Sequence, residues 1–219
     1  MLLGLFLCGS VTGADKAKPL PKDLKSLTAL AEKGDARAQR ELGRAYFYGR
    51  GVSKDIIEGV KWYRRAAEQG NAPSQYQLGW SSGNGRGGKK DFKEAVKWYR
   101  KAAEQGYAKA QNNLGNRYLK GEGVEQDFKE AVKWYRKAAD QGYANAQNNL
   151  GFRYYKGEGV PKSIVNSYVW WNIAAANGQQ NAKNNKSTFT KKMTPAQITK
   201  AEALVKEMVK KNPKLIKKP

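Results

Sequence analysis

A 36-residue period is the feature that most limits how this chain can fold. Residues 93–124, KEAVKWYRKAAEQGYAKAQNNLGNRYLKGEGV, recur almost letter for letter at residues 129–160. The same step separates four tryptophans and five glycines, namely Trp62, Trp98, Trp134 and Trp170, and Gly34, Gly70, Gly106, Gly142 and Gly178. A fixed period of this length indicates supersecondary units that bury their apolar faces against one another. We expect the tryptophans to lie in the core that these units share.

Each unit contains two apolar patterns of helical period, separated by a short glycine loop. The apolar face of the first helix carries Ala110, Leu114 and Tyr118, and that of the second carries Ala95, Trp98, Tyr99, Ala102 and Ala103. Each unit is therefore predicted to be an αα-hairpin. Gly115 should let the two helices approach closely, and Gly106 should end the second helix in a left-handed conformation.

The motifs AxAQxxLGxxYxxGxGV and DxxEAxxWYRxAAxQG resemble the Sel-one-like repeat, a relative of the tetratricopeptide repeat. The resemblance covers four units, at residues 35–70, 71–106, 107–142 and 143–178. It implies an all-α fold, a right-handed α-solenoid of stacked hairpins. It also implies a scaffold or adaptor, often exported in bacteria, that binds proteins or peptides through the solenoid surface.

The segments outside the repeats are predicted to connect and cap the array. Residues 15–22 form a linker, and residues 23–34 match the second helix of a unit, so they should cap the N-terminal end. Residues 179–211 should form C-terminal capping helices, the last of them opened by a capping box at residues 194–197. Residues 212–219 are basic and interrupted by proline, and we expect them to be disordered.

Residues 1–14, MLLGLFLCGSVTGA, form a short apolar run that ends in small residues, as a secretory leader does. This predicts a periplasmic or secreted protein, although the usual basic residues before the apolar run are missing. Cys8 raises the alternative of a lipoprotein, which Leu7 disfavours because such signals have a small residue there. One cysteine and no histidine exclude an intrachain disulfide and a histidine-based metal site or general base.

The net charge of +22 indicates acidic partners or anionic surfaces. Residues 183–219 hold eleven lysines and two glutamates, which should attract anionic membranes, cell-wall polymers or nucleic acid weakly and in a salt-dependent way. Charge alone does not choose among these partners. The resemblance implies a protein or peptide partner, which we expect to be acidic, and export would disfavour nucleic acid.

The first helices should line the concave groove of a tetratricopeptide-like superhelix. Opposite the core face they carry arginines, asparagines and aromatic residues, which suit carboxylates, peptide amides and apolar side chains. The candidate binding residues are Arg40, Arg44, Tyr76, Trp80, Asn112, Asn116, Asn148 and Phe152, flanked by Phe47, Leu119 and Tyr155. The alternative is a merely solvated face. Trp80 lacks an aromatic counterpart in two of the other units, which favours contact with something external.

The second unit departs from the pattern, with Ser82 in place of a tyrosine and Gly88 in place of a valine. We expect residues 81–90 to be the loosest part of the solenoid, with a frayed helix end and a possible hinge. The glycines of residues 83–90 resemble a phosphate-binding loop, but the required strand before them is missing and the repeat explains them.

An enzyme is the main alternative from another class. Some relatives of this repeat family with paired cysteines are assigned as β-lactamases, so a cell-envelope hydrolase is considered. The chain lacks paired cysteines, a histidine base, and SxxK and KTG motifs. No catalytic residue, cofactor or metal ligand is therefore predicted.

Overall fold

The computed structural model describes residues 19–217, so the predicted leader and Cys8 lie outside the described residues. Over these residues the chain forms eleven α-helices and one short 3-10 helix, without a strand. The helices are α1 (Leu24–Glu32), α2 (Ala36–Tyr48), α3 (Ile56–Glu68), α4 (Ala72–Asn84), α5 (Phe92–Glu104), α6 (Ala108–Lys120), α7 (Phe128–Ala139), α8 (Ala144–Lys156), α9 (Ile164–Ala176), α10 (Gln180–Thr190), α11 (Pro195–Lys211) and η1 (Pro213–Leu215).

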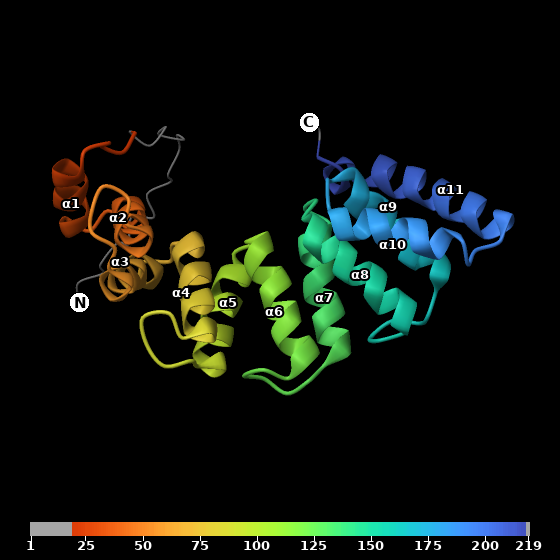
Figure 1. Ribbon diagram of the computed structural model, residues 1–219, viewed down its shortest axis with the longest axis horizontal. Helices are drawn as coiled ribbons and strands as arrows, with labels where there is room; N and C mark the ends of the chain where they lie inside the picture. The colour runs from red at the N-terminus through yellow and green to blue at the C-terminus, as the bar shows by residue number, and fades with distance from the viewer. Residues whose placement is uncertain (1–18, 218–219) are drawn as a thin grey trace, which may run out of the picture.

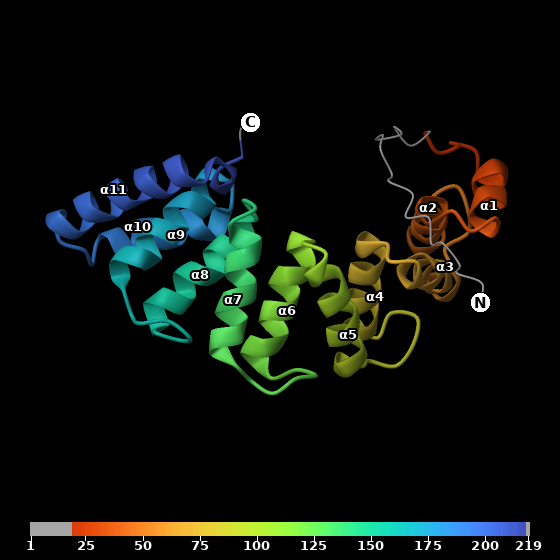
Figure 2. The same ribbon diagram turned by 180° about the vertical axis from the view of Figure 1, so that it is seen from behind.

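Successive helices pair as hairpins that stack into an arch. The pairs α2–α3, α4–α5, α6–α7 and α8–α9 are joined by extensive contacts, and each pair also packs against the next. Figures 1 and 2 show α4–α7 in the middle of the arch, with α1–α3 at one end and α9–α11 at the other. This confirms the predicted all-α solenoid. No helix within residues 19–217 has both the length and the apolar character needed to cross a membrane.

Local sequence sets where each helix begins and ends. Asp55, Asp91 and Asp127 open α3, α5 and α7 because each side chain accepts a hydrogen bond of 2.9 Å from the main-chain N–H three residues on. Glycines in the left-handed conformation end the four first helices of the units. Gly106 has a φ of 86°, as predicted for the end of α5.

The repeated tryptophans and glycines build the core. Trp62, Trp98, Trp134 and Trp170 are 6%, 3%, 6% and 2% exposed, which confirms that they are core residues. A Cβ atom on Gly115 would lie 2.8 Å from Cε1 of Tyr135, so glycine is what allows α6 to approach α7. The repeat therefore specifies both the apolar contacts and the spacing between the helices.

The predicted frayed end of α4 is wrong. This helix has 13 residues, as α2 does, and Gly85 ends it in the left-handed conformation. The main-chain N–H of Asp91 donates to the carbonyl of Ser82 at 2.9 Å, as Asp127 does to Tyr118 at 3.0 Å in the next unit. Because these are main-chain bonds, they survive the loss of the tyrosine side chain. The hinge itself stays a prediction.

The C-terminal segment also differs from the prediction. The capping box at Thr194 and Gln197 is formed, and α11 packs against α9 as expected. The prediction of disorder, however, is wrong for residues 212–217. Leu215 is 2% exposed and belongs to the apolar cluster around α7–α9. Its buried side chain fixes the segment on the solenoid, although lysines flank it in the sequence.

Candidate functional site

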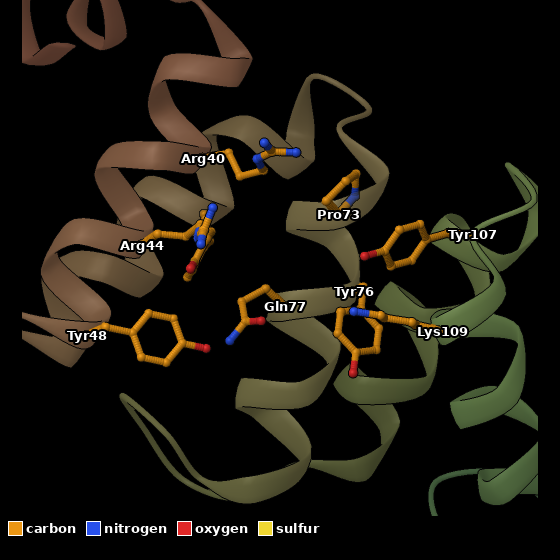
Figure 3. Close-up of a pocket in the computed structure, with 9 residues that line it drawn as sticks. Arg40, Arg44, Tyr48, Pro73, Tyr76, Gln77, Tyr107 and Lys109 are labelled. Carbon is orange, nitrogen blue, oxygen red and sulfur yellow. The ribbon is translucent and has the colours of Figure 1, made fainter. Parts of the chain in front are cut away.

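A pocket of about 300 Å³ lies where the first helices of the first three units meet. We call it the α2–α4–α6 pocket, and Figure 3 shows side chains from these helices around it. Its lining residues are Arg40, Arg44, Tyr48, Tyr63, Pro73, Tyr76, Gln77, Tyr107 and Lys109. The pocket thus brings together three of the predicted binding residues, namely Arg40, Arg44 and Tyr76.

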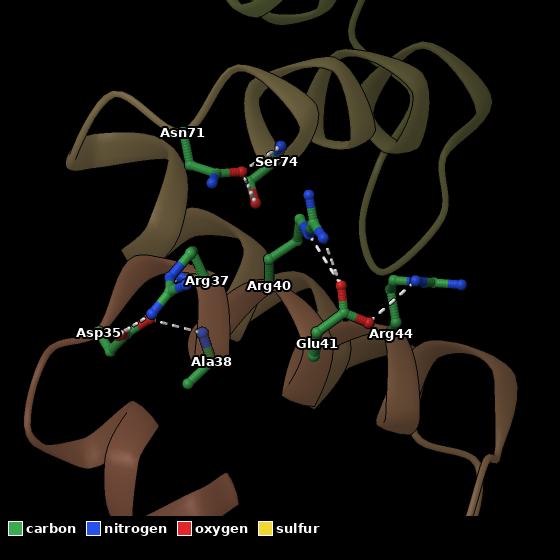
Figure 4. Close-up of polar contacts among 8 residues, drawn as sticks. All are labelled: Asp35, Arg37, Ala38, Arg40, Glu41, Arg44, Asn71 and Ser74. Carbon is green, nitrogen blue, oxygen red and sulfur yellow. Dashed lines mark hydrogen bonds and ion pairs between the residues drawn. The ribbon is translucent and has the colours of Figure 1, made fainter. Parts of the chain in front are cut away.

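One carboxylate orients both arginines of the pocket. The Oε1 atom of Glu41 lies 2.6 Å from Nη2 of Arg40, and its Oε2 atom lies 2.9 Å from Nη1 of Arg44, as Figure 4 shows. The arginine side chains are 33% and 43% exposed, so each keeps N–H groups open to a ligand. Lys109 makes no ion pair within residues 19–217. The pocket therefore carries three cations against one bridging carboxylate.

Tyrosine rings form the second component of the pocket. The ring centroid of Tyr76 lies 5.5 Å from that of Tyr107 and 5.8 Å from that of Tyr99. Burial raises the pKa of Tyr76 to about 12 and raises the pKa of Tyr107 as well. Both phenols are therefore neutral at physiological pH and can donate a hydrogen bond to an anionic ligand. Tyr48, half exposed, offers apolar contact at the rim.

Two of the predicted binding residues are used inside the solenoid instead. Asn112 and Asn148 are 5% and 7% exposed, and they accept hydrogen bonds from asparagines on α8 and α10 respectively. Nδ2 of Asn149 lies 3.0 Å from Oδ1 of Asn112, and Nδ2 of Asn185 lies 3.1 Å from Oδ1 of Asn148. We call these two pairs the asparagine ladder. Because the ladder buries and pairs these amides, their assignment as partner-binding residues is corrected.

The pocket opens where the asparagine ladder is replaced. In the repeat alignment Arg40 and Tyr76 occupy the column of Asn112 and Asn148. In the third and fourth units this column holds short asparagines that join neighbouring helices. In the first two units the long Arg40 side chain turns to Glu41, and the Tyr76 ring packs at a tilt against the rings of Tyr99 and Tyr107. Asparagine pairs therefore join α6 to α8 and α8 to α10, whereas the α2–α4–α6 pocket lies where Arg40 and Tyr76 stand in their place.

The remaining predicted residues lie outside the pocket. Asn116 accepts a hydrogen bond of 2.7 Å from the hydroxyl of Tyr135. Trp80 is half buried with its ring centroid 6.0 Å from that of Phe47, and Phe152 packs edge-on against Trp171 at 5.4 Å. Contact of Trp80 with an external partner stays a prediction.

Several pocket residues were missed by reading the sequence. They are Tyr48, Pro73, Gln77, Tyr107 and Lys109. Tyr48 follows Arg44 by one helical turn, and Pro73 and Lys109 occupy one column of the repeat, so the alignment held a signal for them. Whether these side chains lie near Arg40 depends on how adjacent units pack against each other, and the 36-residue period alone does not predict that packing.

The profile of the Sel1 repeat matches residues 36–71, 72–107, 108–143 and 144–179. The chain belongs to the Sel1 repeat family. Sel1 repeat proteins are typically scaffolds for protein interactions, and the hairpin stack described above is the fold of this family. The matched units begin one residue after the boundaries predicted from the sequence.

Among solved structures, the chain is similar to a Sel1 repeat protein from Oxalobacter formigenes, with 39% sequence identity and a TM-score of 0.71. The alignment covers 74% of this chain and 65% of that protein. A protective antigen of uropathogenic Escherichia coli with an SLR fold is 32% identical, with a TM-score of 0.57. The alignment covers 87% of this chain and 49% of the antigen. The secretory immunoglobulin A-binding protein EsiB of Escherichia coli O6:H1 is 43% identical over 65 residues, which are 30% of this chain and 12% of EsiB. The matches thus cover less than two thirds of each of these relatives.

Proposed function

We propose that this Sel1 repeat protein is a non-enzymatic scaffold that holds an acidic peptide segment of a protein partner in the α2–α4–α6 pocket. The observation that carries the proposal is the convergence of Arg40, Arg44 and Lys109, from α2 and α6, on one tyrosine-lined hollow. Guanidinium groups bind carboxylates through paired hydrogen bonds, and aromatic walls accept the apolar side chains beside them.

Glu41 fits this role because it holds the arginines without neutralising the pocket. Nε and Nη2 of Arg40 both donate to Oε1 of Glu41, at 3.0 and 2.6 Å, which leaves Nη1 for a ligand. Arg44 uses Nη1 on Glu41, which leaves its other N–H groups. Pre-oriented side chains lose less conformational freedom on binding, and this benefit is opposed by the negative charge of Glu41, which repels a ligand carboxylate.

The test is fluorescence anisotropy with two labelled peptides, Asp-Glu-Tyr-Asp-Leu-Glu and its neutral isostere Asn-Gln-Tyr-Asn-Leu-Gln. Because two charge-assisted contacts are removed together, R40A/R44A should weaken binding of the acidic peptide on the order of tenfold or more. K61A/K133A is the matched control, since each lysine pairs at 3.1 Å with a glutamate three residues away, on α3 and α7. Equal loss in both double variants would mean that net charge, and not the pocket, attracts the peptide.

We also propose that the protein acts in the periplasm or outside the cell. The apolar run of residues 1–14 supports this, and so does the 43% identity to EsiB, an Escherichia coli protein named for binding secretory immunoglobulin A. Fractionation of cells that express a C-terminally tagged full chain tests it. The tag should appear in the periplasm or medium, and a tag found wholly in the cytoplasm would contradict the proposal.

A weaker, second interaction with anionic surfaces is favoured by the charge around α10. Residues 159–201 contain six lysines and no acidic residue. A hollow of about 500 Å³ there is lined by Ala175, Lys183, Lys186, Ser187, Thr190 and Lys191. We expect binding to phosphatidylglycerol vesicles that falls steeply between about 50 and 200 mM salt, because the lysines displace counterions from the anionic surface when they bind. Salt-independent binding would contradict it.

The hydrolase alternative has a direct assay. We expect the purified chain to hydrolyse nitrocefin no faster than buffer, because the proposed pocket offers guanidinium, phenol and ammonium groups and no paired nucleophile and base. Hydrolysis that follows the protein through purification would contradict the non-enzymatic proposal.

A further inference from the structure

The turns between successive units form a repeated edge of the solenoid, and one of them is covered. Glycine occupies this turn at Gly34, Gly70, Gly106, Gly142 and Gly178. Within the described residues, nothing lies within 4 Å of the Cβ position at four of them, whereas at Gly142 the carbonyl of Lys214 occupies it. The C-terminal segment 212–217 therefore lies on one of five equivalent turns.

Residues 212–217 are held by hydrogen bonds to their main chain and by one buried side chain, as a bound peptide would be. Nε2 of Gln147 and Nδ2 of Asn177 both donate to the carbonyl of Leu215, at 2.8 and 2.6 Å. The N–H of Lys217 donates to Oδ1 of Asn177 at 2.9 Å, and Nδ2 of Asn212 donates to the carbonyl of Asp140 at 2.9 Å. The Leu215 side chain, 2% exposed, fills the apolar site between these bonds.

The clamp made by Gln147 and Asn177 differs from its counterparts in the other units. There a second-helix glutamine donates to a first-helix glutamine and also reaches back to its own helix, as Gln141 does to Gln111 at 2.8 Å and to the carbonyl of Lys137 at 3.2 Å. The shorter Asn177 keeps the bond to Gln147 at 2.8 Å but turns its remaining contacts to residues 215 and 217. The substitution of asparagine for glutamine thus matches this edge to the C-terminal segment, in which the 3-10 turn η1 is followed by the extended residue Ile216.

We infer that the Gln147–Asn177 clamp is a second peptide-binding site, distinct from the α2–α4–α6 pocket, which residues 212–217 occupy in cis. It selects a partner segment of the same shape, a 3-10 turn that ends in a leucine and presents the leucine carbonyl and, two residues later, a main-chain N–H. Its contacts are main-chain hydrogen bonds and one buried leucine, and no ion pair within residues 19–217 joins Lys214 or Lys217 to it. The partner segment is therefore leucine-bearing and need not be acidic.

The attached segment competes with any partner segment. A short tether supplies an effective concentration on the order of 1 mM, so a peptide with a Kd of about 0.1 mM for the vacant clamp would bind the occupied chain about tenfold more weakly. Access to the site is thus controlled by release of the C-terminal segment.

The test uses the full chain and a labelled peptide of residues 212–219, NPKLIKKP. Leu215→Asn vacates the clamp, and the L215N chain should bind the peptide at least about tenfold more tightly than the wild type. The peptide is basic and so is the chain, so nonspecific attraction does not mimic this result. A peptide with asparagine in place of its leucine should not bind.

Two further variants assign the binding to the clamp. L215N/N177Q restores the glutamine of the other units and should lose the peptide, whereas L215N/Q105N makes the reverse change two units away and should keep it. The Tm of each chain by circular dichroism verifies folding. K217P removes the N–H at residue 217 and fixes φ there while it leaves Leu215 in place, and it replaces L215N if that chain does not fold. No binding to a folded, vacated chain, or equal binding by the two double variants, would overturn the inference.

Discussion

Asn149 donates a hydrogen bond of 3.0 Å from Nδ2 to Oδ1 of Asn112, and this bond ties α8 to α6. The same tie recurs between Asn185 and Asn148 at 3.1 Å. The ladder stops where Arg40 and Tyr76 take over its column, and the α2–α4–α6 pocket lies there. One column of the repeat thus joins neighbouring helices in the C-terminal half of the stack and lines the proposed binding pocket in its N-terminal half.

The asparagine ladder should contribute to stability and not to binding. Asn112→Ala removes the hydrogen bonds of this side chain to Asn149 and Asn113, which should lower the free energy of unfolding by about 1–2 kcal/mol. Urea denaturation followed by circular dichroism measures this loss. Affinity for the acidic peptide should remain that of the wild type, and a parallel loss of affinity would return Asn112 to the binding site.

Glu41→Gln should strengthen binding of the acidic peptide. The substitution keeps the size of the side chain but removes the carboxylate that lies 2.6 and 2.9 Å from the two arginines. One negative charge fewer near a partly exposed anion site is worth on the order of 1 kcal/mol, or about fivefold in Kd. Anisotropy titration measures the change. Weaker binding by E41Q would show that Glu41 acts mainly by orienting the arginines.

Gly115→Ala should destabilise the stack. The added methyl group would meet Cε1 of Tyr135 at 2.8 Å and the carbonyl of Ala131 at 3.1 Å, and the Tyr135 ring is fully buried. Overpacking of this kind costs about 1–3 kcal/mol. Gly88→Ala is the control, because nothing lies within 4 Å of its Cβ position and the change should be neutral or stabilise by up to about 1 kcal/mol. Equal stability of the two variants in urea would contradict the packing account.

Residues 81–90 should exchange their amide hydrogens faster than residues 113–120. Ser82 replaces a half-buried tyrosine and exposed Gly88 replaces a half-buried valine, so this part of the stack has fewer apolar contacts to oppose local opening. Hydrogen exchange followed by mass spectrometry compares the two segments in one experiment. The double variant S82Y/G88V should slow exchange in residues 81–90, and equal protection of both segments in the wild type would exclude a hinge.

The period made the core predictable, because every unit places its tryptophan and its helix-contact glycine in the same environment. The asparagine ladder was not predictable from it. Its bonds join residues 37 apart, one more than the period, and depend on the offset between neighbouring first helices. The order of residues 212–217 was not predicted because the lysines and the proline of this segment favour disorder. Leu215 and Ile216 are the two apolar residues that indicate packing against the solenoid.

A crystal structure of the chain with the Asp-Glu-Tyr-Asp-Leu-Glu peptide tests the central claim most directly. The account predicts a peptide carboxylate within hydrogen-bonding distance of Arg40 or Arg44, with the peptide tyrosine against Tyr76 or Tyr107. A peptide bound elsewhere on the solenoid, with the α2–α4–α6 pocket empty, would contradict it.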